Sequence, residues 1–173
     1  MRTNRLLIVC AMCVLGLLTP TAVRADGIDS FTWSWPYVGA TVTWQLPASP
    51  NIPPGEVDTG DGVFSIQAPF TLNGAPAGSA TFDFLDSGYW GGGLVAWDSY
   101  GSPIVWPSYG ALLYSGTMAA PTFVPGTYDL WVYDPSWPRA TLTISRIPEP
   151  STLLLVGIGM LALLGFARKK IAA

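Results

Sequence analysis

Apolar and polar residues alternate along the middle of this chain, between residues 26 and 146. A period of two places every second side chain on one face, as a half-buried β-strand requires. Turn signals rich in glycine, proline and asparagine separate the alternating runs. The pattern predicts short strands at 28–35, 40–46, 63–68, 79–85, 94–97, 112–115, 127–133 and 140–146. Such a set of short strands predicts one all-β domain, a β-sandwich or jelly roll.

Strand parity predicts which side chains are buried. In the last alternating run, Leu142 and Ile144 fall on the same face and are expected in the core. In the run before it, Trp131 and Tyr133 fall on the face opposite to the aliphatic residues, so we expect them on the outside. Because aromatic side chains bury a large area, further tryptophans are expected to fill the core. These are Trp33, Trp35, Trp44 and Trp97.

A uniformly apolar block precedes the alternating region. Arg2 and Arg5 are followed by an apolar run at 6–18 and by a small-residue pattern that ends at Ala25. A basic start, a short apolar run and small residues are typical of a secretory signal peptide. The run reaches only ~20 Å as a helix, whereas a hydrocarbon core is ~30 Å thick. We therefore expect the segment 1–25 to direct Sec export and to be removed, leaving an exported domain at 26–146.

A second apolar block closes the chain, at residues 147–173. It begins with Pro148, Glu149 and Pro150, continues with an apolar stretch at about 151–167, and ends in a basic cluster. The stretch is just long enough to span a membrane as a helix if the basic side chains extend to the interface. Basic residues favour the cytoplasmic side, so the alternating domain would lie outside. The basic cluster consists of Arg168, Lys169 and Lys170.

These three parts, in this order, resemble the PEP-CTERM sorting signal of Gram-negative bacteria. The resemblance implies that the Pro148-Glu149-Pro150 motif is recognised by a membrane-embedded exosortase. It also implies that the helix holds the motif at the membrane and that the basic cluster acts as the stop. The precursor would be anchored in the inner membrane, and the processed form would reach the cell surface or the exopolysaccharide of a biofilm. A plain C-terminal anchor is the alternative.

Composition excludes several kinds of chemistry. The chain has no histidine, and both cysteines, Cys10 and Cys13, lie in the predicted signal peptide. Zinc sites of the Cys/His type and catalysis with a histidine base are therefore absent from the exported part. All 11 acidic residues lie between 26 and 151 with only two arginines, which gives that stretch a net charge of −9. We expect a protein that is not an enzyme and does not bind nucleic acid.

Some acidic residues stand in patterns that resemble functional sites. Asp58 and Asp86 each begin an Asp-x-Gly tripeptide like that of aspartic proteases, but the two are too close in sequence for two catalytic lobes. Glu56, Asp58 and Asp61 share a glycine-rich loop, and carboxylates on a flexible loop can bind Ca²⁺. A solvated acidic turn is favoured over this calcium site. Asp83 with Asp86 is a weak candidate for a glycosidase pair.

Several aromatic residues fall in predicted loops. Tyr89 and Trp90 precede three glycines, Trp106 and Tyr109 flank a proline-serine pair, and Trp137 lies between prolines. A flat ring exposed on a rigid loop can stack on the apolar face of a sugar. Two functions are therefore open. The first is a structural or interaction component of the cell surface, associated with exopolysaccharide; the alternative is a carbohydrate-binding module that uses these rings. Neither requires a cofactor.

Overall fold

The structure is a computed structural model that describes residues 27–147 and Gly159. In this part of the chain, no helix is long and apolar enough to cross a membrane. The predicted signal peptide and C-terminal helix lie outside the described residues. The elements are β1 (Ile28–Trp35), β2 (Ala40–Pro47), the 3-10 helix η1 (Pro54–Glu56), β3 (Val57–Asp58), β4 (Val63–Leu72), β5 (Ala75–Leu85), β6 (Gly93–Asp98), β7 (Pro103–Tyr109), β8 (Tyr114–Thr117), β9 (Ala120–Phe123), β10 (Gly126–Val132) and β11 (Ala140–Ile147).

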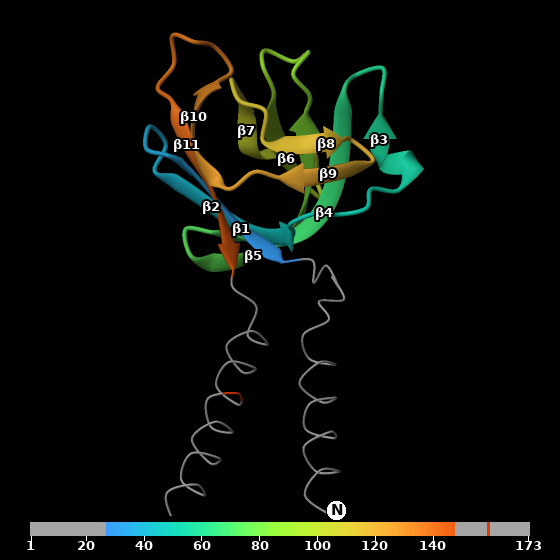
Figure 1. The fold of residues 1–173 in the computed structure, drawn as a ribbon. Helices are drawn as coiled ribbons and strands as arrows, with labels where there is room; N and C mark the ends of the chain where they lie inside the picture. The colour runs from blue at the N-terminus through green and yellow to red at the C-terminus, as the bar shows by residue number, and fades with distance from the viewer. Residues whose placement is uncertain (1–26, 148–158, 160–173) are drawn as a thin grey trace, which may run out of the picture.

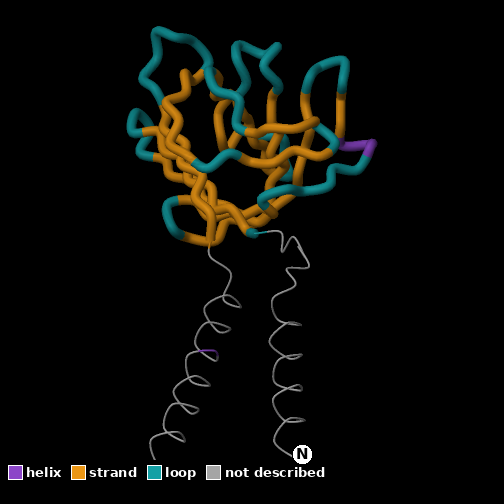
Figure 2. Tube along the Cα trace, in the orientation of Figure 1, coloured by secondary structure: helices purple, strands orange, loops and turns teal. Residues whose placement is uncertain are grey.

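Eight of these strands form a closed barrel. The order β2-β1-β11-β10-β7-β6-β5-β4 is closed by pairing between β2 and β4, and all neighbouring strands are antiparallel. Each barrel strand pairs with the next barrel strand along the chain, and the last pairs with the first (Figure 1). Two insertions interrupt this up-and-down path, namely η1 with β3 and the β8–β9 hairpin. Figure 2 shows the strands curving around the core, with turns and loops at their ends.

The all-β prediction is confirmed, but the predicted sandwich is wrong. The barrel needs two pairings that a sandwich would not combine. The first strand pairs with the last, β1 with β11, from Ile28↔Ile147 to Ser34↔Thr141. The pairing of β2 with β4 completes the ring and is shorter, with three register pairs. A strand in a sandwich and a strand in a barrel each have one buried face, so their alternation is the same. Alternation alone therefore could not distinguish the two folds.

Aromatic rings fill the barrel interior. Trp44 stacks on Phe82 with ring centroids 4.3 Å apart, and on Phe31 at 5.1 Å. Trp33 is also fully buried and donates from Nε1 to Ser108 Oγ at 3.1 Å, so its polar atom is satisfied inside the core. Burying one such side chain contributes about 1.5–3 kcal/mol. The core predictions are confirmed for Trp33, Trp35, Trp44, Leu142 and Ile144.

Trp97 was predicted in the core, and this prediction is wrong. Its side chain is only partly buried, and its neighbour in β6, Ala96, is the residue that points inward. Trp97 Nε1 donates to Asp83 Oδ2 at 2.9 Å on the outer face of the sheet. The strand that contains Trp97 has few polar residues, so alternation does not show which face this side chain occupies.

The strand β7 was predicted as a loop. Val105 and Ser108 are both buried although they are three residues apart, and the register between β6 and β7 shifts at this point. A β-bulge adds a residue to one strand and so interrupts the period of two. Trp106 and Pro107 occupy the irregular step. The bulge explains why alternation did not predict this strand. The strands β3 and β9 were not predicted either, because they are too short to produce an alternating pattern.

The two openings of the barrel differ. Because neighbouring strands are antiparallel, connections alternate between the ends. One end, called here the terminal end, holds the start of β1, the end of β11 and the connections at 48–62, 86–92 and 110–125. The other, called here the turn end, holds the shorter connections at 36–39, 73–74, 99–102 and 133–139.

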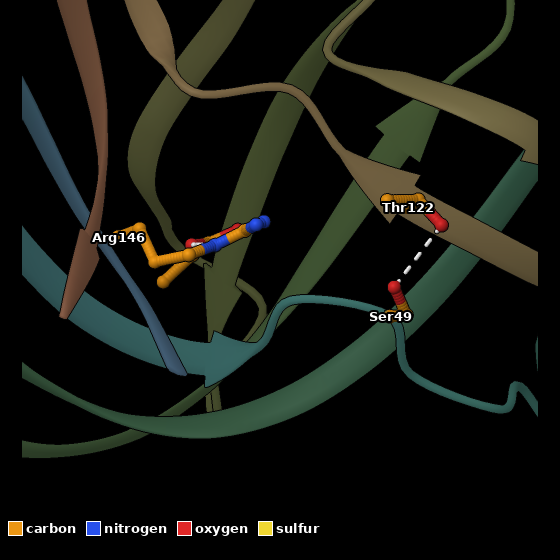
Figure 3. Close-up of polar contacts among 4 residues, drawn as sticks. Ser49, Thr122 and Arg146 are labelled. Carbon is orange, nitrogen blue, oxygen red and sulfur yellow. Dashed lines mark hydrogen bonds and ion pairs between the residues drawn. The ribbon is translucent and has the colours of Figure 1, made fainter. Parts of the chain in front are cut away.

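The β8–β9 hairpin covers the terminal end. Phe123 packs edge-on against Phe31 with ring centroids 4.9 Å apart, and Tyr114 against Phe64 at 4.9 Å. The backbone N–H of Phe123 donates to the carbonyl of Ala48 at 2.9 Å. Figure 3 shows a second tie between the same segments, the 3.0 Å hydrogen bond between the hydroxyls of Ser49 and Thr122. The hairpin therefore extends the core over this opening.

An ion pair joins the first and last strands at the terminal end. Arg146 Nε donates to Asp29 Oδ1 at 3.2 Å, and the two residues are register partners in β1 and β11. Asp29 is fully buried while Arg146 is half exposed, and Figure 3 shows the extended arginine side chain. The aliphatic part of Arg146 lies close to Gly27. The ion pair thus links the first and the last strand of the barrel at the terminal end.

Candidate functional site

Eight aromatic side chains lie along one strip of the surface, called here the aromatic band. It follows the seam where β7 pairs with β10 and extends into loops at both ends of the barrel. All eight side chains are exposed or partly exposed. The members are Tyr37, Tyr89, Trp90, Trp106, Tyr109, Trp131, Tyr133 and Trp137.

The terminal-end part of the band is centred on Trp90. Its ring lies 6.0 Å from that of Trp131, edge to face, and 6.4 Å from that of Tyr109. Trp90 is 65% exposed and has a φ of +51°. A bulky residue with positive φ is uncommon and costs free energy, and such strain concentrates at functional sites. Trp90 is therefore held in an exposed position by a left-handed backbone conformation that tryptophan rarely adopts.

Glycines fix the loop that carries Trp90. Gly93 has a φ of +150°, and a Cβ at this position would lie 2.0 Å from the carbonyl oxygen of Ser108. At Gly92 a Cβ would lie 2.7 Å from the carbonyl oxygen of Ala111. Only glycine allows the loop backbone to approach β7 and the following segment this closely. The three glycines after Trp90 thus hold its ring against the band.

The middle of the band lies on β7 and β10. Tyr109 and Trp131 are register partners, and the N–H of Tyr133 donates to the carbonyl of Pro107 at 2.9 Å. Tyr133 is therefore diagonal to Tyr109, a position within reach of aromatic side chains. Burial raises the pKa of Tyr109, and the nearby phenols of Tyr133 and Tyr89 raise it further. The pairing of β7 with β10 therefore places the two halves of the band next to each other.

The turn-end part of the band contains Tyr133, Trp137 and Tyr37. Ring centroids lie 6.4 Å apart between Tyr133 and Trp137, and 6.2 Å apart between Trp137 and Tyr37. The ring of Trp106 lies 5.3 Å from that of Tyr133. Tyr37 is 66%, Tyr133 53% and Trp137 44% exposed. Tyr133 also has a positive φ, +59°. Each half of the band therefore contains one exposed aromatic residue with a strained backbone.

Buried and backbone groups hold these rings in place. Trp35 lies beneath Trp137 with ring centroids 6.0 Å apart, and its Nε1 donates to the carbonyl of Pro138 at 2.8 Å. Within the same loop, the N–H of Ser136 donates to Asp134 Oδ1 at 2.8 Å. The hydrogen bonds from Ser136 lower the pKa of Asp134. The loop at 133–139 is thus preorganised, which lowers the entropic cost of binding.

The band includes every aromatic residue that the sequence suggested for glycan contact: Tyr89, Trp90, Trp106, Tyr109 and Trp137. Sequence reasoning missed Tyr37, and it placed Trp131 and Tyr133 on the outer face without assigning them to a site. The outward position of these two residues is confirmed. Strand parity was the available signal, and the missing information was that β7 and β10 are neighbours. The arrangement offers a row of preformed apolar faces with hydroxyl and indole N–H groups beside them.

The two Asp-x-Gly tripeptides form turns. Asp58 Oδ1 accepts hydrogen bonds from the N–H groups of Gly60 and Asp61, at 2.9 and 3.1 Å. Asp86 Oδ1 accepts from the N–H of Gly88 at 2.8 Å. Such short-range bonds from a carboxylate to the following backbone are typical of Asx turns. The turn interpretation of both tripeptides is therefore confirmed.

The other carboxylates do not gather at one point. Among residues 27–147, no three or more His, Cys, Asp and Glu side chains form a group that could hold a metal ion. Glu56 is in η1, and Asp58 bonds within its own loop. The calcium site at Glu56, Asp58 and Asp61 stays an untested prediction. Asp83 accepts from Ser65 Oγ at 2.6 Å and from Trp97 Nε1, so both of its oxygens are engaged on the outer face of the barrel.

The predicted sorting residues, Pro148 to Pro150 and Arg168 to Lys170, lie outside the described residues. A family model, the PEP-CTERM protein-sorting motif, matches residues 146–169. Comparisons with curated proteins and with solved structures gave no match. The resemblance inferred from the sequence is therefore confirmed. The motif implies export, processing by an exosortase and a surface or extracellular destination.

Proposed function

From the premise that this chain carries a PEP-CTERM sorting motif and is exported, we propose that its barrel is a non-catalytic component of the cell surface or exopolysaccharide matrix. In this proposal the barrel contacts a glycan through the aromatic band. The observation that carries the proposal is the band itself: eight aromatic side chains gather on the surface of an exported domain, and seven of them make ring contacts with others of the set. Single exposed apolar residues are common on protein surfaces, but a contiguous patch marks an interaction site.

The position of the sorting motif supports this function. The motif begins at Arg146, in the last strand of the barrel, and Ile147 still pairs with Ile28. The barrel therefore joins the sorting segment at the terminal end without an intervening linker. The turn end, with Tyr37, Tyr133 and Trp137, is the opposite opening of the same barrel. A protein held through its terminal end would leave the turn-end rings free for a partner.

We favour binding over catalysis because the carboxylates of Asp58, Asp83 and Asp86 have structural roles. Asp83 is fully hydrogen-bonded, and Asp58 and Asp86 cap turns. A glycosidase needs two carboxyl groups on either side of one glycosidic bond, one of them with a raised pKa. The carboxylates near the band include Asp134, whose pKa is lowered, which is the wrong direction for a general acid.

Delivery is proposed to follow the full sequence of steps expected from the two terminal segments. Sec export would remove residues 1–25, the helix at about 151–167 would anchor the precursor in the inner membrane, and an exosortase would cleave near Pro148 to Pro150. In cells that lack the exosortase, the full-length precursor should stay in the membrane fraction. Intact-mass analysis of membrane and extracellular fractions tests this step, and identical processing in both strains would contradict it.

Glycan contact is tested with the mature protein recovered from its native host. The mature protein and its Trp90→Ala and Trp137→Ala variants are titrated with the exopolysaccharide of that host, and tryptophan fluorescence is recorded. Tyr100→Ala is the matched control, because Tyr100 is 91% exposed but lies outside the band, in the turn at 99–102. We expect each band variant to bind about tenfold more weakly, which corresponds to ~1.4 kcal/mol. Equal affinities for all four proteins would contradict a role of the band.

A further inference from the structure

We infer that the aromatic band takes one uncharged polysaccharide chain lengthwise, from the loop at 86–92 to the turn at 36–39. This inference rests on the proposed function and specifies the ligand and its orientation. The rings of the band follow one another along the surface. Ring contacts join Trp90 to Trp131 and Tyr109 in one half, and Tyr133 to Trp137 and Trp137 to Tyr37 in the other. The pairing of β7 with β10 places the two halves next to each other. The two ends of this path belong to opposite openings of the barrel.

The tilt between neighbouring rings of the band excludes a flat ligand surface. Trp90 is at 88° to Trp131 and at 36° to Tyr109. At the turn end, the ring of Trp137 makes angles of 56° with both Tyr133 and Tyr37. Rings so inclined cannot all lie against one plane, as a crystalline polysaccharide would require. They can each meet a different sugar of a single chain that turns along its length.

The charge of the barrel domain favours an uncharged ligand. Residues 27–147 carry nine carboxylates and two arginines, a net charge of −7. A carboxylate lies close in sequence to each half of the band: Asp86 precedes Tyr89 and Trp90, and Asp134 follows Tyr133. The arginine of the turn-end loop, Arg139, donates from its guanidinium to the carbonyl of Asp129. A polymer of uronic or sulfated sugars would meet repulsion at both halves, whereas the hydroxyls of an uncharged chain can donate to these carboxylates.

Backbone strain occurs in both halves of the band. In the described part of the chain, three residues other than glycine have positive φ: Asn73, Trp90 and Tyr133. Asn73 belongs to the Asn-Gly turn between β4 and β5, where this conformation is ordinary. The other two are exposed aromatic residues, one in each half of the band. Strain held at both halves is expected when both must present a ring to the same ligand.

The test uses host exopolysaccharide that has been partly hydrolysed, separated by length, and divided into neutral and acidic fractions by anion exchange. Binding to the mature protein and to its Trp90→Ala, Trp137→Ala and Tyr100→Ala variants is measured by titration. We expect the neutral fraction to bind, with an affinity that rises with chain length. Long chains should lose about tenfold in both band variants. Short oligomers, which cover only one half of the band, should be insensitive to at least one of the two substitutions.

Several results would overturn the inference and leave the proposed function standing. One is tighter binding of the acidic fraction. Another is an affinity that does not depend on chain length, and a third is long-chain binding that only one of the two tryptophan substitutions weakens. A lack of binding by every fraction would overturn the inference and the proposed function together. Added salt provides a second readout, because binding of an uncharged chain should change little with ionic strength.

Discussion

The barrel has two populations of aromatic side chains, one in its interior and one on its surface. Phe31, Trp33 and Trp44 point inward and are buried. In the aromatic band, by contrast, Trp131 points outward from β10, and Trp90 and Tyr133 are exposed in connections. The inward rings contribute packing and hydrophobic free energy. The outward rings contact one another at the surface and leave apolar faces open. The same residue types thus serve stability on one face and, in our proposal, recognition on the other.

The largest expected effect comes from an inward ring. Phe31→Ala should lower the free energy of unfolding by about 3–5 kcal/mol, because it removes a buried ring and leaves a cavity. Phe31 contacts Trp44, Phe84 and Phe123, so the loss would affect both the barrel and the hairpin that covers it. Urea unfolding followed by tryptophan fluorescence measures the change, with Tyr100→Ala as the control. A loss under about 1 kcal/mol would show that the interior is not packed as described.

A smaller loss is expected at the ion pair of the terminal end. Arg146→Met should cost about 2–3 kcal/mol, because it leaves the buried carboxylate of Asp29 without a counter-charge, and the half-exposed arginine moderates the effect. The double variant Asp29→Leu with Arg146→Met should be closer to the wild-type stability than Arg146→Met alone. Both are compared by urea unfolding. A double variant at least as unstable as the single one would argue that the pair contributes net stability beyond charge compensation.

The strained backbone at Trp90 gives a contrast of about 1 kcal/mol. Trp90→Gly should be more stable than Trp90→Ala by about that amount, since glycine adopts positive φ without steric cost. Both variants should lose glycan binding to a similar degree. At Trp137, where no positive φ occurs, the order should reverse because glycine gains more entropy on unfolding. Thermal unfolding of the four variants gives the comparison, and the same order at both positions would contradict the role of strain.

The smallest effect concerns pH. Hydrogen bonds from Ser136 lower the pKa of Asp134 in the folded state, so the ionised carboxylate stabilises the loop at 133–139. This stabilisation is present above the ordinary carboxyl pKa, near 4, and is lost as pH falls through the lower folded value. Asp134→Asn, which keeps an acceptor but does not titrate, should show a weaker loss of stability in this acid range. Unfolding at a series of pH values measures it, and parallel curves for the two proteins would disprove the linkage.

Strand parity correctly predicted whether several individual side chains lie in the core or on the surface. It assigned Leu142 and Ile144 to the core and Trp131 and Tyr133 to the surface, because these strands alternate regularly. It failed where the alternation is interrupted or absent: the bulge near Trp106 concealed β7, and the apolar β6 concealed the outward position of Trp97. The closed barrel could not be predicted, since closure depends on which distant strands pair.

The candidate site could also be predicted only in part from the sequence. Turn chemistry identified the rings on loops, such as Trp90 and Trp137, because glycines and prolines mark exposed connections. Their union into one band required the β7–β10 pairing and the turn at 36–39, which places Tyr37 beside Trp137. The positive φ of Trp90 and Tyr133 is a tertiary effect that local sequence does not specify. The sorting motif, by contrast, is a local sequence pattern, and its resemblance was recognised from the sequence alone.

The most direct test of the account is the amount of mature protein that stays with exopolysaccharide in the native host. Cells would express the wild-type chain, the double variant Trp90→Ala with Trp137→Ala, or Tyr100→Ala, and the polysaccharide fraction would be separated from the culture medium. The account predicts that the wild-type and Tyr100→Ala proteins are retained with the polysaccharide, while the double variant is exported, processed and found in the medium. Equal retention of all three proteins would contradict it.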